Sequence, residues 1–222
     1  MKPTPLLFAG IFASFAAAWL GLIVASDKQI GSLEAQVDAE NETVYPLNVG
    51  GIVERGRRVY IGNGCNQCHT QFVRDADSGK DLARQWGTRR TVALDYLYAS
   101  GAELGLTRIG PDLANVGTDP EVNPARPYLK DPQWLLQHLY NPRIHTPESI
   151  MPSYAFLFEK RKIQGQQSAN ALKLEGRFAP AYGEEVVPTE DALALVAYLL
   201  SLDRTQPVSE SNGGQAAASQ AK

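Results

Sequence analysis

The pentapeptide Cys65-Asn66-Gln67-Cys68-His69 constrains this chain more than any other feature, and it contains the only two cysteines among 222 residues. Two thiols three positions apart lie on one turn of the chain, so both can add to the vinyl groups of a single haem. The adjacent His69 then lies beneath the iron as a fixed axial ligand. The pattern therefore predicts one covalently attached haem c, held by Cys65, Cys68 and His69.

A C-x-x-C pair also occurs in zinc sites and in thioredoxin-like dithiol enzymes, and the sequence argues against both. Zinc would need two further thiol or imidazole ligands, and only His138 and His145 remain. A dithiol oxidoreductase places its pair at the start of a helix after a buried strand, with no obligatory histidine beside it. Here the pair follows a glycine-flanked helical stretch, residues 55–61, and polar residues come after it.

The N-terminal segment is apolar enough to cross a membrane. Residues 5–25 are 21 consecutive uncharged residues, and at ~1.5 Å per residue a helix of that length spans a hydrocarbon core of about 30 Å. A cleaved signal peptide is the rival interpretation, but its apolar region is usually only about 7 to 15 residues long. Ile23 before Ala25 also spoils a small-x-small cleavage site. We therefore expect residues 1–26 to be an uncleaved transmembrane anchor in contact with membrane lipid.

Charges on the two sides of this segment predict its orientation. Lys2 precedes the segment, whereas a single Lys28 follows it among several acidic residues. These acidic residues are Asp27, Glu34, Asp38, Glu40 and Glu42. The positive-inside rule then puts the N-terminus in the cytoplasm and the rest of the chain on the periplasmic or outer face of the cytoplasmic (inner) membrane. Haem c is attached on that face, so the two signals agree.

Composition and length predict a single exported domain. The net charge is -3 and no basic stripe exists to neutralise phosphates, so we expect no nucleic-acid partner. Residues 50–205 are enough for one core and one mono-haem domain, joined to the anchor by a juxtamembrane linker, residues 27–49. Residues 206–222 are rich in Ser, Gly, Gln and Ala, and we expect this tail to be disordered.

Helical periodicity dominates the exported part. Helices are expected over residues 52–62, 132–140 and 189–202, with Asp131 and Thr189 as N-caps of the second and third. A further short helix is expected near residues 92–99. Because no clean strand alternation appears, the sequence predicts an all-α domain wrapped around a cofactor. Glycine permits close backbone approach, so we also expect Gly56 to pack against the last helix around Tyr198.

The second axial position of the iron has three candidates, Met151, His138 and His145. Met151 is followed by Pro152 in a segment of loop formers, where a rigid turn can present its sulfur to the iron. A lone internal methionine more often fills a gap in a core, but methionine and histidine are a common haem pair. Met151 is therefore the preferred ligand. His138 is expected within a helix and His145 in a loop, and both stay open as alternatives.

The segment Gly110-Pro111-Asp112 offers support for His69. A metal-ligating imidazole normally donates its other ring N–H to a carbonyl, which orients the ring and raises its basicity. We expect the Pro111 carbonyl to be this acceptor and so count Pro111 with the cofactor-binding residues. Without the haem motif the same residues would be interpreted as an ordinary Gly-Pro turn.

Taken in order, these segments resemble the mono-haem subunit II of cbb3-type cytochrome c oxidase. The resemblance begins at the anchor and continues to about Phe158. It is carried by residues 64–71 with Arg74, and by residues 86–90, 110–117, 141–143 and 147–154. Residues 92–107 and 159–188 look inserted or long relative to the family pattern, so contacts made there cannot be transferred.

The resemblance implies a class I-like cytochrome c domain with long loop insertions, and His69 and Met151 as iron ligands. It also implies two partners: a haem-copper catalytic subunit beneath the domain, and a di-haem cytochrome c subunit as electron donor. The chain would then carry electrons toward oxygen reduction and catalyse no reaction by itself. Two other functions stay open, the haem c subunit of nitric oxide reductase and a haem-based gas sensor or peroxidase in which Met151 is only packing.

Overall fold

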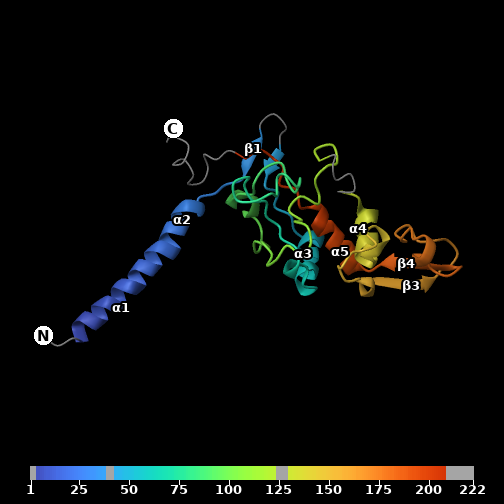
Figure 1. Ribbon diagram of the computed structural model, residues 1–222, viewed down its shortest axis with the longest axis horizontal. Coiled ribbons are helices and arrows are strands. Elements are labelled where there is room, and N and C mark those ends of the chain that lie inside the picture. Colours follow the sequence, from blue (N-terminus) through green and yellow to red (C-terminus); the bar gives the residue numbers. More distant parts are fainter. Residues whose placement is uncertain (1–3, 39–42, 124–129, 209–222) are drawn as a thin grey trace. The chain divides into compact units, whose positions relative to one another are not determined.

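The computed structural model describes residues 4–38, 43–123 and 130–208 (Figure 1). Contacts divide the chain into two units, one formed by residues 1–47, 92–99 and 207–222, and one formed by residues 48–91 and 100–206. Each unit is described by itself. Most of the tail for which disorder was predicted, from residue 209 onward, lies outside the described residues.

The first unit begins with one continuous helix from Thr4 to Ile30 (Figure 1). It consists of α1 (Thr4–Trp19), a single π-helical turn η1 (Leu20–Val24) and α2 (Ala25–Ile30). The helix is long and apolar enough to cross a membrane, as predicted, and none of its residues is buried within the protein. It continues four residues beyond the expected end of the anchor at residue 26, so Asp27 and Lys28 lie in its last turns.

Two short strands follow where only a linker was expected. β1 (Gln36–Asp38) pairs antiparallel with β2 (Thr43–Tyr45). The short helix expected near residues 92–99 is present as a 3-10 helix, η3 (Ala93–Tyr96). Asp95 connects these parts: its carboxylate accepts from the Val92 backbone N–H at 2.8 Å and from the Tyr45 hydroxyl at 2.6 Å.

The second unit contains the three helices that periodicity predicted, α3 (Ile52–Gly62), α4 (Pro132–Tyr140) and α5 (Glu190–Leu200). The predicted caps are present as well. The Asp131 carboxylate accepts from the first free backbone N–H groups of α4, at 2.9 and 3.2 Å. The Thr189 hydroxyl accepts from the Ala192 N–H at the start of α5. Each cap satisfies donors that the first helical turn leaves without partners.

Helices α3 and α5 cross at Gly56, which confirms the expected close approach. A Cβ atom at Gly56 would lie 1.9 Å from the Ala194 carbonyl oxygen and 2.7 Å from the Tyr198 Cβ. One turn away, the rings of Tyr60 and Tyr198 pack with their centroids 5.5 Å apart. The two ends of the unit are therefore held together by direct backbone contact.

The prediction of an all-α domain is wrong in part, because the described residues include a second antiparallel hairpin. β3 (Phe158–Lys162) pairs with β4 (Glu184–Pro188), with Phe158 opposite Pro188. The sequence of β3 shows no apolar alternation, because Phe158 is followed by four charged residues. Phe158 is buried and those four residues are exposed. The hairpin spans most of the predicted insertion 159–188 and contributes Val186 to the core.

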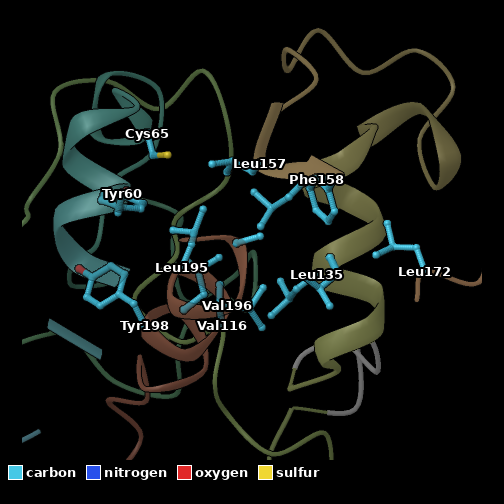
Figure 2. Close-up of a cluster of buried hydrophobic side chains, with 14 of the residues drawn as sticks. Tyr60, Cys65, Val116, Leu135, Leu157, Phe158, Leu172, Leu195, Val196 and Tyr198 are labelled. Atoms are coloured by element: carbon cyan, nitrogen blue, oxygen red, sulfur yellow. The ribbon is translucent and has the colours of Figure 1, made fainter. Parts of the chain in front are cut away.

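The core joins α3, α4, α5 and the hairpin in one cluster of buried side chains (Figure 2). Figure 2 shows the Cys65 sulfur at the end of α3 pointing toward Leu157, which precedes β3. Met151 and Tyr154 pack against the same cluster from its edge. The remaining 3-10 helices are η2 (Cys65–Gln67), η4 (Pro142–Ile144), η5 (Ala155–Leu157) and η6 (Gly176–Phe178).

Candidate cofactor site

The cysteine pair and its histidine lie on one tight turn directly after α3. Gly64 adopts a left-handed conformation, with φ of 71°, that ends the helix and starts the 3-10 turn η2. The backbone N–H groups of Cys68 and His69 both donate to the Cys65 carbonyl, at 3.2 and 3.0 Å. Sequence spacing predicted this arrangement, and it places two thiols and an imidazole on the same turn.

The environment of Cys65 disfavours its thiolate form. Neither cysteine forms a disulfide, and Cys65 is buried whereas Cys68 is partly exposed. Burial raises the pKa of the Cys65 thiol to about 11, against a smaller lowering by its hydrogen bond with Tyr154. A dithiol oxidoreductase needs a thiolate with a lowered pKa, so the environment of Cys65 does not suit that alternative.

A loop formed by residues 104–113, here called the proximal loop, runs along the haem-binding motif. Its backbone N–H groups at Leu106 and Gly110 donate to the carbonyls of Asn66 and Cys68, at 2.8 and 2.9 Å. The Thr107 hydroxyl donates to the Gln67 carbonyl at 2.5 Å. These hydrogen bonds fix the loop to the turn at successive positions.

The proximal loop supplies the predicted partner of His69. The His69 Nδ1 lies 2.7 Å from the Pro111 carbonyl oxygen, and the carbonyl can only accept, so Nδ1 carries the proton. The other ring nitrogen, Nε2, then has a free lone pair for a metal. Burial lowers the pKa of His69, with a smaller opposing effect of the Pro111 hydrogen bond, which favours the neutral ring that ligation requires.

Two glycines let the proximal loop approach His69 this closely. A Cβ atom at Gly110 would lie 2.2 Å from the His69 Cε1, and one at Gly105 would lie 2.1 Å from the His69 carbonyl oxygen. Gly105 also has a φ of 83°, a conformation that side-chain-bearing residues rarely adopt. No other residue type fits at either position without moving the histidine.

A buried ion-pair network behind the proximal loop was not predicted from the sequence. The carboxylate of Asp81 is fully buried and accepts from the guanidinium of Arg108 at 2.7 Å and from that of Arg74 at 3.0 Å. Burial alone would raise the pKa of Asp81, but hydrogen bonds from Arg74 and Arg108 lower it to about 2. Asp81 belongs to none of the sequence motifs, and no local pattern distinguishes it from a surface aspartate.

Met151 lies on a loop that is tied to the end of α4. The Tyr154 backbone N–H donates to the Leu139 carbonyl at 2.9 Å, and the Arg143 guanidinium donates to the Met151 carbonyl at 3.3 Å. The Met151 side chain is half-buried against the cluster that contains Cys65. The structure thus packs Met151 against the hydrophobic cluster that contains Cys65, while its bond to an iron stays a prediction.

The two alternative ligands, His138 and His145, stack in parallel with Trp134. Each imidazole ring lies 4.8 Å from the indole, with interplanar angles of 10° and 18°. Burial, with smaller contributions from the neighbouring His145 and His69, lowers the pKa of His138 to about 4, so His138 is neutral at pH 7. The Nδ1 of His138 and the Nε2 of His145 are buried and have no hydrogen-bond partner among the residues that the structure describes.

The residues of this region fit a haem. The donor set is two free thiols, an imidazole with its Nε2 lone pair available and a thioether on the same core. Buried polar atoms without partners are rare, and the two orphaned imidazole nitrogens mark a place where a polar group outside the chain can bind. Among the residues that the structure describes, no three Cys, His, Asp or Glu side chains gather into a group that could hold a zinc ion.

Comparison with known proteins gives the same picture. Residues 32–202 match the family described as cytochrome C oxidase, mono-heme subunit/FixO, which covers most of the chain after the N-terminal helix. No curated protein matches the chain. The single haem motif agrees with the mono-heme subunit that this description names. The chain therefore belongs to the mono-heme subunit (FixO) family of cytochrome c oxidase.

Proposed function

We propose that this subunit is a membrane-anchored, class I-like mono-haem cytochrome c that relays electrons within a respiratory terminal oxidase. The observation that carries the proposal is the cysteine turn with its hydrogen-bonded histidine. Cys65 and Cys68 lie on the same turn as His69, and His69 already has the tautomer of a metal ligand. Family membership supports a place in an oxidase rather than in nitric oxide reductase.

In this function the side chains have distinct tasks. Cys65 and Cys68 would hold the haem through two thioether bonds, and His69 and Met151 would be the ligands of its iron. Pro111 orients the His69 ring through its carbonyl. The bound haem supplies reversible one-electron exchange. With His69 and Met151 both bound to the iron, the protein would leave no position for oxygen or substrate, and the subunit would transfer electrons without catalysing a reaction alone.

The anchor and the partners determine where the haem domain would exchange electrons. The helix Thr4–Ile30 would hold the haem domain at the periplasmic face of the inner membrane, next to the subunits that exchange electrons with it. Membership of the oxidase family implies partner oxidase subunits. We propose a di-haem cytochrome c subunit as donor and the haem-copper catalytic subunit as acceptor.

The relay can be tested on the intact complex. The chain is extracted from membranes with its partners, and its haem reduction is followed by rapid-mixing absorbance spectroscopy after adding a reduced cytochrome c donor. We expect the haem of this subunit to be reduced after the donor haems and before the catalytic subunit. Reduction of the catalytic subunit at an unchanged rate in a complex without this subunit's haem would contradict the relay.

A gas sensor or peroxidase is the competing function, and carbon monoxide binding to the isolated, reduced subunit distinguishes it. Such a protein keeps one face of its iron open, so the reduced subunit would bind carbon monoxide. The half-buried Met151, fixed through hydrogen bonds on both sides of its loop, favours a closed site. We expect the reduced subunit to bind no carbon monoxide.

A further inference from the structure

We propose that Arg108 and Asp112 are positioning residues that fix the Pro111 carbonyl against the axial His69, with Asp81 as the buried counter-ion that holds Arg108 in place. The inference rests on the proposed function, since it concerns the haem ligand. It goes beyond that function by assigning a redox role to Asp112 and to the ion pair between Arg108 and Asp81.

Arg108 is bound through each side of its guanidinium. Its Nε donates to the Thr70 hydroxyl at 3.0 Å, one Nη donates to both oxygens of Asp81 at 2.7 Å, and the other donates to the Phe72 carbonyl at 2.7 Å. The group also lies over the rings of Phe72 and Trp86, 4.7 and 5.4 Å from their centroids. A planar guanidinium held by this many partners is fixed in one orientation, and the flexible ammonium group of a lysine cannot form the same set of contacts.

Asp112 forms the second attachment of the same loop. Its carboxylate is fully buried and accepts from the Thr70 hydroxyl at 2.6 Å, from the Phe72 N–H at 2.9 Å and from the Ala114 N–H at 2.8 Å. Both Arg108 and Asp112 therefore bind Thr70 and Phe72, which lie one and three residues after His69. The three residues between these two attachments include Gly110 and Pro111, the residues that contact the His69 ring.

This arrangement gives the network a predictable effect on the haem. A strong hydrogen bond from Nδ1 makes the imidazole a more basic ligand, and a more basic ligand favours ferric over ferrous iron. If the attachment at Arg108 or Asp112 is weakened, the Pro111 carbonyl moves away from His69 and the hydrogen bond between them weakens. The midpoint potential of the haem must then shift to a more positive value.

The experiment compares two arginines on the same carboxylate. Arg108→Lys keeps the charge but loses the fork, and Arg74→Lys makes the same change on an arginine that also binds Asp81 but lies outside the proximal loop. The full chain is isolated with its haem, and the midpoint potential and the solvent-exchange rate of the His69 Nδ1 proton are measured. We expect a positive shift and faster exchange for Arg108→Lys, and parent values for Arg74→Lys.

Thr70→Val supplies a second, uncharged test in case Arg108→Lys does not accumulate. It removes the hydroxyl that Arg108 and Asp112 share, and we expect the potential to shift in the same direction. Haem-loaded Arg108→Lys or Thr70→Val protein with the parent potential and proton exchange would overturn the positioning role. Equal shifts in the Arg74 and Arg108 variants would overturn it too, because the lost contact with the Asp81 carboxylate would then explain both. A parent chain without covalent haem would instead refute the proposed function.

Discussion

Replacing Gly56 by alanine tests the crossing of α3 and α5, which holds the two ends of the haem domain together. The new methyl group would lie 1.9 Å from the Ala194 carbonyl oxygen, 2.6 Å from its carbon and 2.7 Å from the Tyr198 Cβ. Two of these three atoms belong to the backbone of α5, so no rotation of a side chain relieves the contact. The helices must separate by about 1.1 Å at this point merely to bring the closest pair to 3.0 Å, the shortest distance that real Cβ atoms show.

The expected cost follows from two opposing effects. A gap of ~0.5 to 1 Å forfeits about a quarter to a half of each van der Waals contact along the interface, and overpacking of this kind typically costs ~1 to 3 kcal/mol. Because backbone atoms block the methyl group, we expect an overpacking cost at the upper end of this range, about 3 kcal/mol. Alanine regains roughly 1 kcal/mol of helix propensity over glycine. The net loss is therefore about 2 kcal/mol, or a melting temperature lower by about 4 to 8 °C for a domain of this size.

The assay is thermal unfolding of the haem-loaded full chain in detergent, followed by far-ultraviolet circular dichroism. Gly62→Ala is the matched control, since Gly62 ends the same helix and a Cβ atom there meets nothing within 4 Å. The control should melt at the parent temperature or slightly above it. If Gly56→Ala and Gly62→Ala melt together at the parent temperature, the close crossing is not a constraint and the reasoning fails.

Three further predictions concern the cofactor and its surroundings. Replacing Cys65 and Cys68 together by serine should abolish covalent haem, because the chain has no other thiol, and a haem-stained denaturing gel that stays positive would contradict the attachment. Met151→Ala should keep the covalent haem but let the reduced protein bind carbon monoxide, whereas His138→Ala should leave the ligand spectrum unchanged; the reverse result would show that the axial assignment is wrong. For Asp81, whose pKa is lowered from 3.8 to about 2, the native state is favoured by the ionised carboxylate above about pH 4, and this contribution is lost as the pH falls through 2. The stability difference between the parent and Asp81→Asn, measured by urea unfolding, should therefore narrow over that interval, and a difference independent of pH would refute the lowered pKa.

The elements that local chemistry determines could be predicted from the sequence. Helix α4 begins at its Asp131 cap and ends before Asn141-Pro142, and each of these signals acts within one turn. The hydrogen bond between His69 and Pro111 was also expected, because a haem-ligating imidazole needs an acceptor and a Gly-Pro turn can supply one.

The parts that depend on distant contacts could not be predicted. The strand β3 is charged along most of its length, and it is a strand because β4, more than twenty residues later, supplies its hydrogen bonds and a buried Val186. Asp81 acquires its role only when the chain brings Arg74 and Arg108 to it from both sides. Neither partnership leaves a periodic or local trace in the sequence.

The contact between α3 and α5 also has a consequence for the order of events during biosynthesis. The buried face of α3 lies on residues 52–62, and its partner is the last helix, residues 190–200. At ~5 to 20 residues per second, α5 is synthesised on the order of ten seconds after α3. Until then Gly56 and Tyr60 have no helix to pack against, and the adjoining Cys65 cannot yet be enclosed by the completed core. The Cys65 thiol therefore stays accessible to solvent until α5 has been synthesised and packed.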